Sequence, residues 1–291
     1  FDFQKAKEGV YQIIWGLVKK VVIADTCATY ANAIFDNYTS MNSLSLILGA
    51  VYFAFQIYGD FSGYSDMTLG MSKLFGLDLL RNFNYPYFSR DIAEFWRRWH
   101  ISLSSWFRDY LYIPLGGSRG SKLKQVRNVF IIFVVSGFWH GANWTFLAWG
   151  FINAMYFLPS LLLGTNRNNM ETAELHWDFN SVKVFFNILA TFTLACLAWI
   201  FFRANSIHIA FDYIGKIFTN GTFASQFLPN QRYNHEMLLL VLAFVLVEWN
   251  SRYKIEPISG KYSWLKMALC LLAIIALGTY ADYKEFIYFQ F

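Results

Sequence analysis

Several apolar stretches of this sequence approach the length that a membrane-spanning helix requires. Residues 184 to 202 contain no charged side chain before Arg203, and residues 44 to 58 form a second apolar run that ends at Gly59 and Asp60. A helix needs about 20 mainly apolar residues to cross the hydrocarbon core of a bilayer. These runs predict a helical membrane protein, because a helix satisfies its own backbone hydrogen bonds in lipid.

Composition argues against the alternative of a large soluble core. Hydrophobic residues make up 56% of the 291 residues and charged residues only 15%, whereas soluble domains carry about 25% charged residues. A soluble protein of this length would need more charge to cover its surface. The three cysteines, Cys27, Cys196 and Cys270, form no closely spaced pair, so we predict neither a disulfide framework nor a zinc site.

The remaining apolar stretches complete a polytopic helical bundle. Residues 10 to 24 are interpreted as a span whose Lys19 and Lys20 extend to the inner surface, and residues 67 to 80 as a separate helix after a break at Gly59–Asp66. Residues 128 to 163 are long enough for two spans, broken at Gly141–Asn143, and shorter spans follow at 237–247 and 264–281. We therefore expect an all-α fold with six to eight membrane-embedded helices.

Positive charge is concentrated in residues 73 to 127, the longest region without a span. This region has ten basic and four acidic residues, so its net charge is +6 against +5 for the whole chain. Cytoplasmic loops of membrane proteins are rich in Lys and Arg, which places this basic region on the cytoplasmic side. The same charges would attract the phosphates of a ligand, although membrane topology alone also explains them.

Residues 89 to 110 are predicted to form one amphipathic helix that carries His100. Ser89 is a suitable N-cap, and Glu94 can pair with Arg97 and Arg98 one turn later. His100 is then either a core histidine bonded to a backbone carbonyl or a residue that lines a tunnel near a reaction centre. It belongs to a stripe at helical spacing: Trp96, Trp99, His100, Leu103, Phe107 and Tyr110.

His140 is the stronger candidate for function, because it follows an uncharged run over residues 129 to 139. A titratable side chain at membrane depth is costly and marks a functional site by default. Ser136 and Gly137 lie one helical turn before it on the same face, and Asn143, three residues later, is placed to orient it. The imidazole would face a gap lined by small residues. The alternative is that these residues only let two helices pack closely.

The surroundings of His140 favour a general base over a metal ligand. A catalytic zinc usually has three protein ligands, but the other histidines, His176, His208 and His235, are scattered along the sequence. Burial disfavours the imidazolium, so a buried imidazole remains able to accept a proton. No G-x-S-x-G motif occurs and no cysteine is near either histidine in sequence, which favours direct transfer between two bound substrates.

Asp60 and Asp66 are further polar residues at the end of an apolar run. They are six residues apart, so they would not share a face of one helix, and we interpret them as structural or pore-facing. If they formed a proton relay with His140, the chain would be a transporter. That alternative predicts polar residues along several spans, and residues 184–202 and 264–281 have few. A non-catalytic assembly subunit is the third possibility.

Three motifs, in this order, resemble the membrane-bound O-acyltransferases. They are residues 56–66 (QIYGDFSGYSD), 95–117 (FWRRWHISLSSWFRDYLYIPLGG) and 137–144 (GFWHGANW). They are most similar to the alginate O-acetyltransferase branch, with the D-alanyl transfer protein of teichoic acid synthesis as a close relative. The resemblance covers most of the chain, including its end, residues 286–291 (FIYFQF). Members of the family have several further N-terminal helices, so the chain resembles the C-terminal part of a longer protein.

The resemblance implies one membrane-embedded domain over residues 1–291, in which amphipathic or re-entrant helices surround a central funnel. Residues 73–127 would form its basic cytoplasmic side, and residues 129–163 the helices that carry the essential histidine. It implies a multi-pass protein of the bacterial inner membrane that binds no nucleic acid and needs neither a metal nor a cofactor.

The resemblance also implies an activity. An acetyl or other short acyl group passes from a cytoplasmic thioester, acyl-CoA or an acyl carrier, to a hydroxyl of an exported polysaccharide or of a periplasmic acetylation partner. Transfer of D-alanine is the alternative within the family. Carried over residue by residue, the essential histidine is His140 and the second motif histidine is His100. Trp99, Arg97 and Asp60, together with the small residues around His140, are then expected to line the tunnel.

Overall fold

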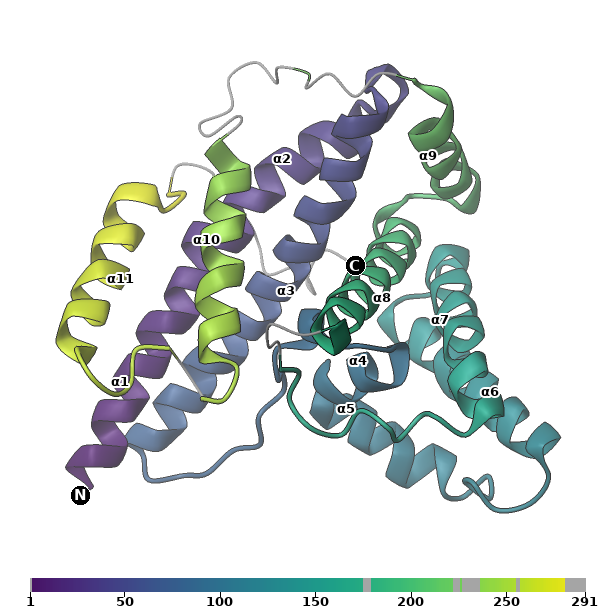
Figure 1. Cartoon of the computed structure of the whole chain (residues 1–291), viewed down its shortest axis with the longest axis horizontal. Helices are drawn as coiled ribbons and strands as arrows, with labels where there is room; N and C mark the ends of the chain where they lie inside the picture. The colour runs from purple at the N-terminus through teal and green to yellow at the C-terminus, as the bar shows by residue number, and fades with distance from the viewer. Residues whose placement is uncertain (1, 175–178, 222–225, 227–235, 255–256, 281–291) are drawn as a thin grey trace. The chain divides into compact units, whose positions relative to one another are not determined.

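The computed structural model describes residues 2–174, 179–221, 226, 236–254 and 257–280. Every regular element within these residues is a helix, and they contain no strand. The helices belong to two compact units, Phe1–Arg81 with Lys216–Phe291, and Asn82–Gly215. Figure 1 labels the helices of both units. The prediction of an all-α protein is confirmed, and the boundary between the units lies inside the basic region of residues 73–127.

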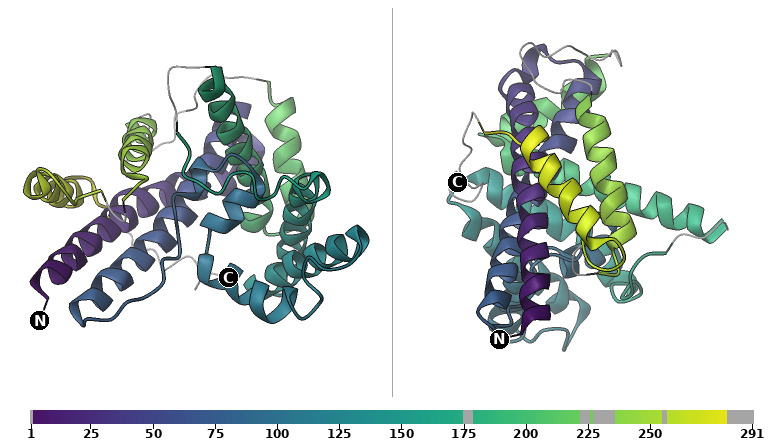
Figure 2. Two further views of the ribbon diagram at one scale, coloured as in Figure 1. Left: turned by 60° about the horizontal axis from the view of Figure 1, so that its bottom comes forward. Right: turned by 90° about the vertical axis from the view of Figure 1, so that its left-hand side faces the viewer.

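In the first unit, α1 (Phe3–Leu17) continues through a π-helical segment (Val18–Ala24) into α2 (Asp25–Asp36), and a short turn leads to α3 (Ser43–Leu74). The unit also contains α10 (Glu236–Ser251) and α11 (Ser263–Leu277). Helices α1 and α3 lie side by side (Figure 2). Glycines allow this approach, because a Cβ atom on Gly16 would lie 2.6 Å from the carbonyl oxygen of Gly63.

Helix α3 is continuous, so the predicted break at Gly59–Asp66 and the separate helix over residues 67–80 are wrong. It begins after Asn42, whose side chain accepts a hydrogen bond from the backbone N–H of Ser45, and it has 32 residues. At 1.5 Å per residue it is about 48 Å long. The polar residues in its middle do not end the helix, because side chains from the π-helical segment pair with them.

Lys19 and Lys20 do not extend to a membrane surface as predicted. Lys19 is 4% exposed, and its Nζ lies 3.1 Å from carboxylate oxygens of both Asp66 and Glu248. Lys20 Nζ lies 2.7 Å from Asp60 Oδ1. Charges taken out of water are tolerated when they are paired in this way. The lysines that suggested a membrane surface thus hold three segments of the first unit together.

The second unit holds both candidate histidines. Two short helices, α4 (Ile92–Arg98) and α5 (Ile101–Phe107), are followed by a π-helical segment (Arg108–Tyr112). Helices α6 (Lys122–His140) and α7 (Trp144–Leu163) form an antiparallel pair, as the predicted break at Gly141–Asn143 requires. Helix α8 (Phe179–Arg203) packs against α7, and α9 (Ile207–Thr219) leads into the first unit.

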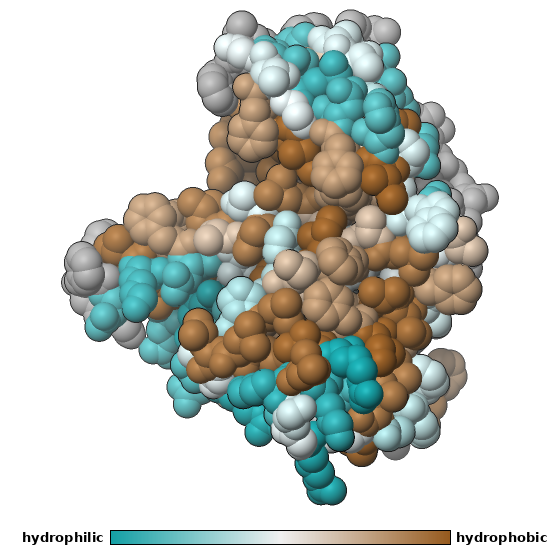
Figure 3. Space-filling view, turned by 90° about the vertical axis from the view of Figure 1, so that its right-hand side faces the viewer, coloured by the Kyte–Doolittle hydropathy of each residue, from teal (hydrophilic) through white to brown (hydrophobic). Residues whose placement is uncertain are grey.

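Three helices of the described residues are long and apolar enough to cross a membrane: α3, α7 and α8. Helices α10 and α11 are apolar but shorter, and the expected number of six to eight membrane-embedded helices stays a prediction. Hydrophobic side chains dominate the face shown in Figure 3. Large apolar side chains on α7 and α8 are half or more exposed, among them Phe151, Phe185 and Phe186. Such exposure fits helices that contact lipid.

Candidate functional site

The predicted helix over residues 89–110 is wrong, because the chain turns sharply at His100. Helix α4 ends at Arg98 and α5 begins at Ile101, while His100 between them has a left-handed backbone with φ of 44°. The N-cap of α4 is Asp91 instead of Ser89: its side chain accepts from the Glu94 N–H at 2.7 Å. The Ser89 hydroxyl donates to the carbonyl oxygen of Pro86.

The turn at His100 has a physical cause in residues 82–84. The backbone N–H of Ile101 donates to the carbonyl oxygen of Asn82, and the N–H of Asn84 donates to the carbonyl oxygen of Arg98, both at 2.9 Å. These bonds replace those that a continuous helix would make. A left-handed conformation is uncommon for a residue other than glycine and persists where the surroundings enforce it.

A cavity of about 720 Å³ brings the two histidines together in the second unit. This volume is in the range of small-molecule binding sites. Helices α4 to α7 and the loop over residues 164–170 form its wall. Five of the predicted site residues line it: Arg97, Trp99, His100, Ser136 and His140.

His140 is the last residue of α6, and aromatic rings surround it. Its ring centroid lies 4.9 Å from that of Trp139, 5.2 Å from that of Trp149 on α7 and 5.2 Å from that of Phe202 on α8. Trp149 and Phe202 are 1% and 2% exposed. Such apolar surroundings favour the neutral imidazole, which is the form that accepts a proton.

The small residues before His140 have different roles. Ser136 lines the cavity and is buried. Gly137 faces α7, where a Cβ atom would collide with the carbonyl oxygen of Phe146. Gly137 therefore lets α6 and α7 pack closely, as the alternative interpretation of the small residues proposed, whereas Ser136 faces the cavity. Asn143 is outside α6 and caps α7: its side chain accepts from the Thr145 N–H at 3.2 Å.

His100 is 9% exposed, and its ring is stacked on Phe83 at 6.5 Å with an interplanar angle of 16°. The ring of Trp139 also lies near it, at 6.1 Å. Burial lowers the pKa of His100 to about 4, since the charged form is costly away from water. His100 is therefore neutral at physiological pH, with one ring N–H able to donate.

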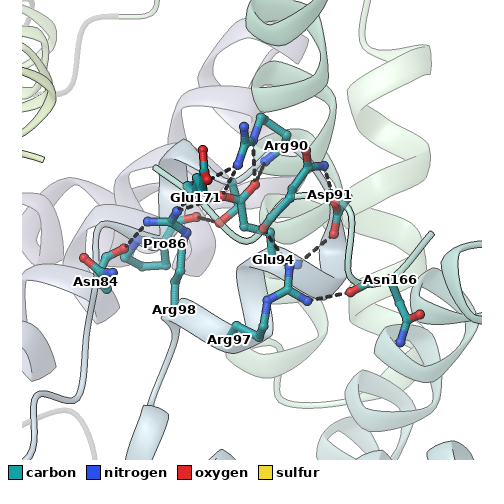
Figure 4. A network of polar contacts seen from close by, with 11 residues as sticks. Asn84, Pro86, Arg90, Asp91, Glu94, Arg97, Arg98, Asn166 and Glu171 are labelled. Carbon is teal, nitrogen blue, oxygen red and sulfur yellow. Dashed lines mark hydrogen bonds and ion pairs between the residues drawn. The ribbon is translucent and has the colours of Figure 1, made fainter. Parts of the chain in front are cut away.

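Arg97 lines the cavity and also binds the loop over residues 164–170, which lines the same cavity (Figure 4). One guanidinium nitrogen donates to the carbonyl oxygen of Asn166 at 2.7 Å and another donates to that of Asn169 at 2.9 Å. The Asn169 side chain in turn donates to the Asp91 carboxylate at 2.6 Å. Arg97 is thus engaged with the protein backbone and also lines the cavity.

Glu94 is the centre of the same network. Its carboxylate pairs with Arg98 at 2.8 Å, as predicted, and with Arg90 at 3.0 Å in place of the predicted Arg97. Both arginines also donate to the carbonyl oxygen of Glu171. The loop around residues 166–171 is therefore joined to α4 at several points, and α4 leads directly into His100.

Basic side chains also line the cavity: Lys122, Arg108 and Arg167. Helix α6 runs 19 residues from Lys122 to His140, about 27 Å at 1.5 Å per residue, so Lys122 lies far from His140. Arg108 is paired with Asp109 at 2.7 Å. We did not predict from the sequence that residues 164–170 line the cavity. Gly164, which ends α7 with φ of 70°, marks a turn there, but nothing local shows that the chain returns to α4.

Other predicted residues lie elsewhere. Asp60 was expected in the tunnel, but it belongs to the first unit, where it pairs with Lys20. His208 is exposed on α9, and His176 and His235 lie outside the described residues. Within the part of the chain that the structure describes, no three His, Cys, Asp or Glu side chains are grouped to hold a metal ion.

Comparison with known proteins gives consistent matches. The family model for the membrane-bound O-acyltransferase family matches residues 3–214. A probable alginate O-acetylase of Pseudomonas putida is 37% identical over 99% of this chain and 61% of its own length. A peptidoglycan O-acetyltransferase of Helicobacter pylori is 35% identical over 100% of this chain and 58% of its own length.

A more distant relative is a teichoic acid D-alanyltransferase of Streptococcus thermophilus. It is 40% identical, but over 37% of this chain and 28% of its own length. The chain spans about three fifths of the P. putida and H. pylori relatives.

Proposed function

Since this chain belongs to the membrane-bound O-acyltransferase family, we propose that it transfers a short acyl group from a thioester to a hydroxyl. The observation that carries the proposal is the cavity lined by both His100 and His140, whose wall also includes the basic side chains of Lys122, Arg108 and Arg167. An imidazole kept neutral among aromatic rings is suited to act as a general base.

In the proposed reaction, His140 takes the proton from the acceptor hydroxyl while its oxygen attacks the carbonyl carbon of the thioester. The neutral His100 donates its ring N–H to the carbonyl oxygen as negative charge develops there. The carbon–sulfur bond then breaks, and the thiolate receives the proton from the His140 imidazolium. The products are an ester and a free thiol, and His140 is regenerated.

The donor is proposed to enter the cavity near Lys122, at the end of α6 opposite His140. Coenzyme A and acyl carrier proteins both attach the acyl group to a phosphate-bearing arm, and Lys122, Arg108 and Arg167 supply positive charge for that phosphate. The basic region of residues 73–127 would face the cytoplasm of a bacterium, with the helices in its inner membrane. No further cofactor is needed for this reaction.

The acceptor is proposed to be a hydroxyl of an exported polysaccharide or of a periplasmic acetylation partner. Two relatives matched over nearly the whole chain are named for O-acetylation of alginate and of peptidoglycan. Transfer of D-alanine is less favoured, because two teichoic acid D-alanyltransferases match less of the chain, one over 37% at 40% identity and one over 69% at 27% identity. A proton relay is also less favoured, because Asp60 and Asp66 pair with lysines of the first unit.

The proposal is tested with His140→Asn in the full-length protein. Purified enzyme is supplied with labelled acetyl-CoA and a polysaccharide acceptor, and ester formation is followed by mass spectrometry. Loss of a general base is expected to lower the rate about 10²- to 10⁴-fold. His208→Asn, an exposed histidine outside the cavity, is the matched control. Unchanged acetylation by His140→Asn would refute the catalytic role.

A further inference from the structure

Trp139 is an exposed aromatic residue that contacts both histidines of the cavity. Its indole centroid lies 4.9 Å from the ring of His140 and 6.1 Å from that of His100. In contrast to these contacts, 52% of the Trp139 surface is exposed. Trp149 and Phe202, which also contact the ring of His140, are almost completely buried, whereas Trp139 presents an exposed face beside the proposed base.

We propose that the exposed face of Trp139 binds the acceptor and that this acceptor is a sugar ring. The inference rests on the proposed function, because it assigns one substrate of that reaction to a place. A group that lies against Trp139 has His140 next to it, and acyl transfer requires the acceptor hydroxyl to reach that imidazole.

The flat apolar surface of an indole binds a sugar ring more favourably than it binds an isolated hydroxyl group. One face of a pyranose ring carries C–H groups, and these pack on the flat aromatic surface and remove apolar area from water. The hydroxyl groups point outward from the rim of the stacked ring, where a neighbouring imidazole can accept a proton. A serine side chain of a protein partner has no ring to stack, so it would gain little from Trp139.

The position of Trp139 also separates the two substrates. Trp139 lies in the last turn of α6, whereas Lys122 is the first residue of the same helix, about one helix length away. A phosphate-bearing donor at the Lys122 end and a sugar at the Trp139 end would meet at His140. Neither substrate would then have to leave before the other binds.

Trp144 provides a matched control. It is 74% exposed at the start of α7, four residues from His140, and among the described residues its ring contacts neither histidine. Exposed tryptophans are common where helices meet the membrane surface. If Trp139 served only to anchor the helix at that surface, Trp144 would be equally important.

The experiment compares Trp139→Leu, Trp139→Tyr and Trp144→Leu in the full-length protein. Acetyl-CoA is the donor, and the acceptors are an alginate oligosaccharide, which has sugar rings, and glycerol, which has none. Trp139→Leu is expected to raise the KM for the oligosaccharide about 10-fold, which is a larger change than the one expected in the KM for acetyl-CoA or in the rate with glycerol. Trp139→Tyr should retain most of the affinity, and Trp144→Leu should behave as the wild type.

Two outcomes would overturn the inference. An equal loss with both acceptors in Trp139→Leu would show that Trp139 positions the histidines, and an equal loss in Trp139→Leu and Trp144→Leu would indicate membrane anchoring. Oligosaccharide binding to His140→Asn protein, measured by isothermal titration with and without Trp139→Leu, does not depend on turnover. A roughly 10-fold weaker binding with Trp139→Leu supports the sugar site even if acyl transfer is absent, and equal binding refutes it.

Discussion

The two units bury polar side chains in different ways. In the first unit Lys19 lies between Asp66 and Glu248, so each charge faces an opposite charge at about 3 Å. In the second unit His100 and His140 lie among aromatic rings at the wall of a cavity. A lysine between two carboxylates binds helices together, whereas a neutral imidazole beside a cavity is available for proton transfer. Burial alone does not separate these roles, but the neighbouring side chains do.

The largest expected effect tests the structural role of the ion pairs. Lys19→Met leaves two buried carboxylates without their shared cation, and breaking a buried pair costs about 3–5 kcal/mol. We expect a strongly lowered free energy of unfolding in detergent, measured by denaturation. His140→Asn, by contrast, should unfold nearly as the wild type does. A Lys19→Met protein as stable as the wild type would show that the cluster is not structural.

The next effect is a dependence of stability on pH in the second unit. Burial lowers the pKa of His100 from 6.5 to about 4, so between these values the unfolded chain binds the extra proton. Stability should therefore fall as the pH decreases from about 6.5 to 4, by roughly 3 kcal/mol in total, and this contribution should change no further below pH 4. The free energy of unfolding is measured by denaturation at several pH values for the wild type and for His100→Asn. If the two free energies depended on pH in the same way, the prediction would be wrong.

A smaller effect is expected at the loop over residues 164–170, which lines the cavity. Arg97→Lys keeps the positive charge but loses the two hydrogen bonds from the guanidinium to the carbonyl oxygens of Asn166 and Asn169. The loss should lower the stability of the loop by about 1.5–3 kcal/mol. Trypsin should then cleave after Arg167 more rapidly, and the KM for acetyl-CoA should rise. Arg119→Lys, an exposed arginine that does not line the cavity, is the control. Unchanged cleavage would mean that Arg97 does not hold the loop.

The smallest effect concerns the backbone at His100. Asparagine tolerates the left-handed conformation better than alanine does, by about 1 kcal/mol. His100→Asn should therefore be more stable than His100→Ala, although both lack the imidazole and should lose acyl transfer equally. Thermal unfolding and activity of the two variants measure these contributions separately. Equal stability would show that the backbone at this position is not strained.

Features that depend on residues close together in the chain could be predicted from the sequence alone. The apolar runs predicted an all-α membrane protein, and Gly141–Asn143 marked the turn between α6 and α7, because helix formation and helix ends follow local composition. The family resemblance rested on three contiguous motifs and is confirmed by the match over residues 3–214. His140 stood out because the run before it is uncharged.

The tertiary structure decided what depends on residues far apart in the chain. The backbone of residues 82–84 breaks the predicted helix at His100, and the partners of Lys19 come from α3 and α10. Trp149 and Phe202 surround His140 from two later helices. A hydrogen bond or ring contact across such distances leaves no periodic pattern in the sequence. The histidines were therefore visible in the sequence, but the cavity that joins them was not.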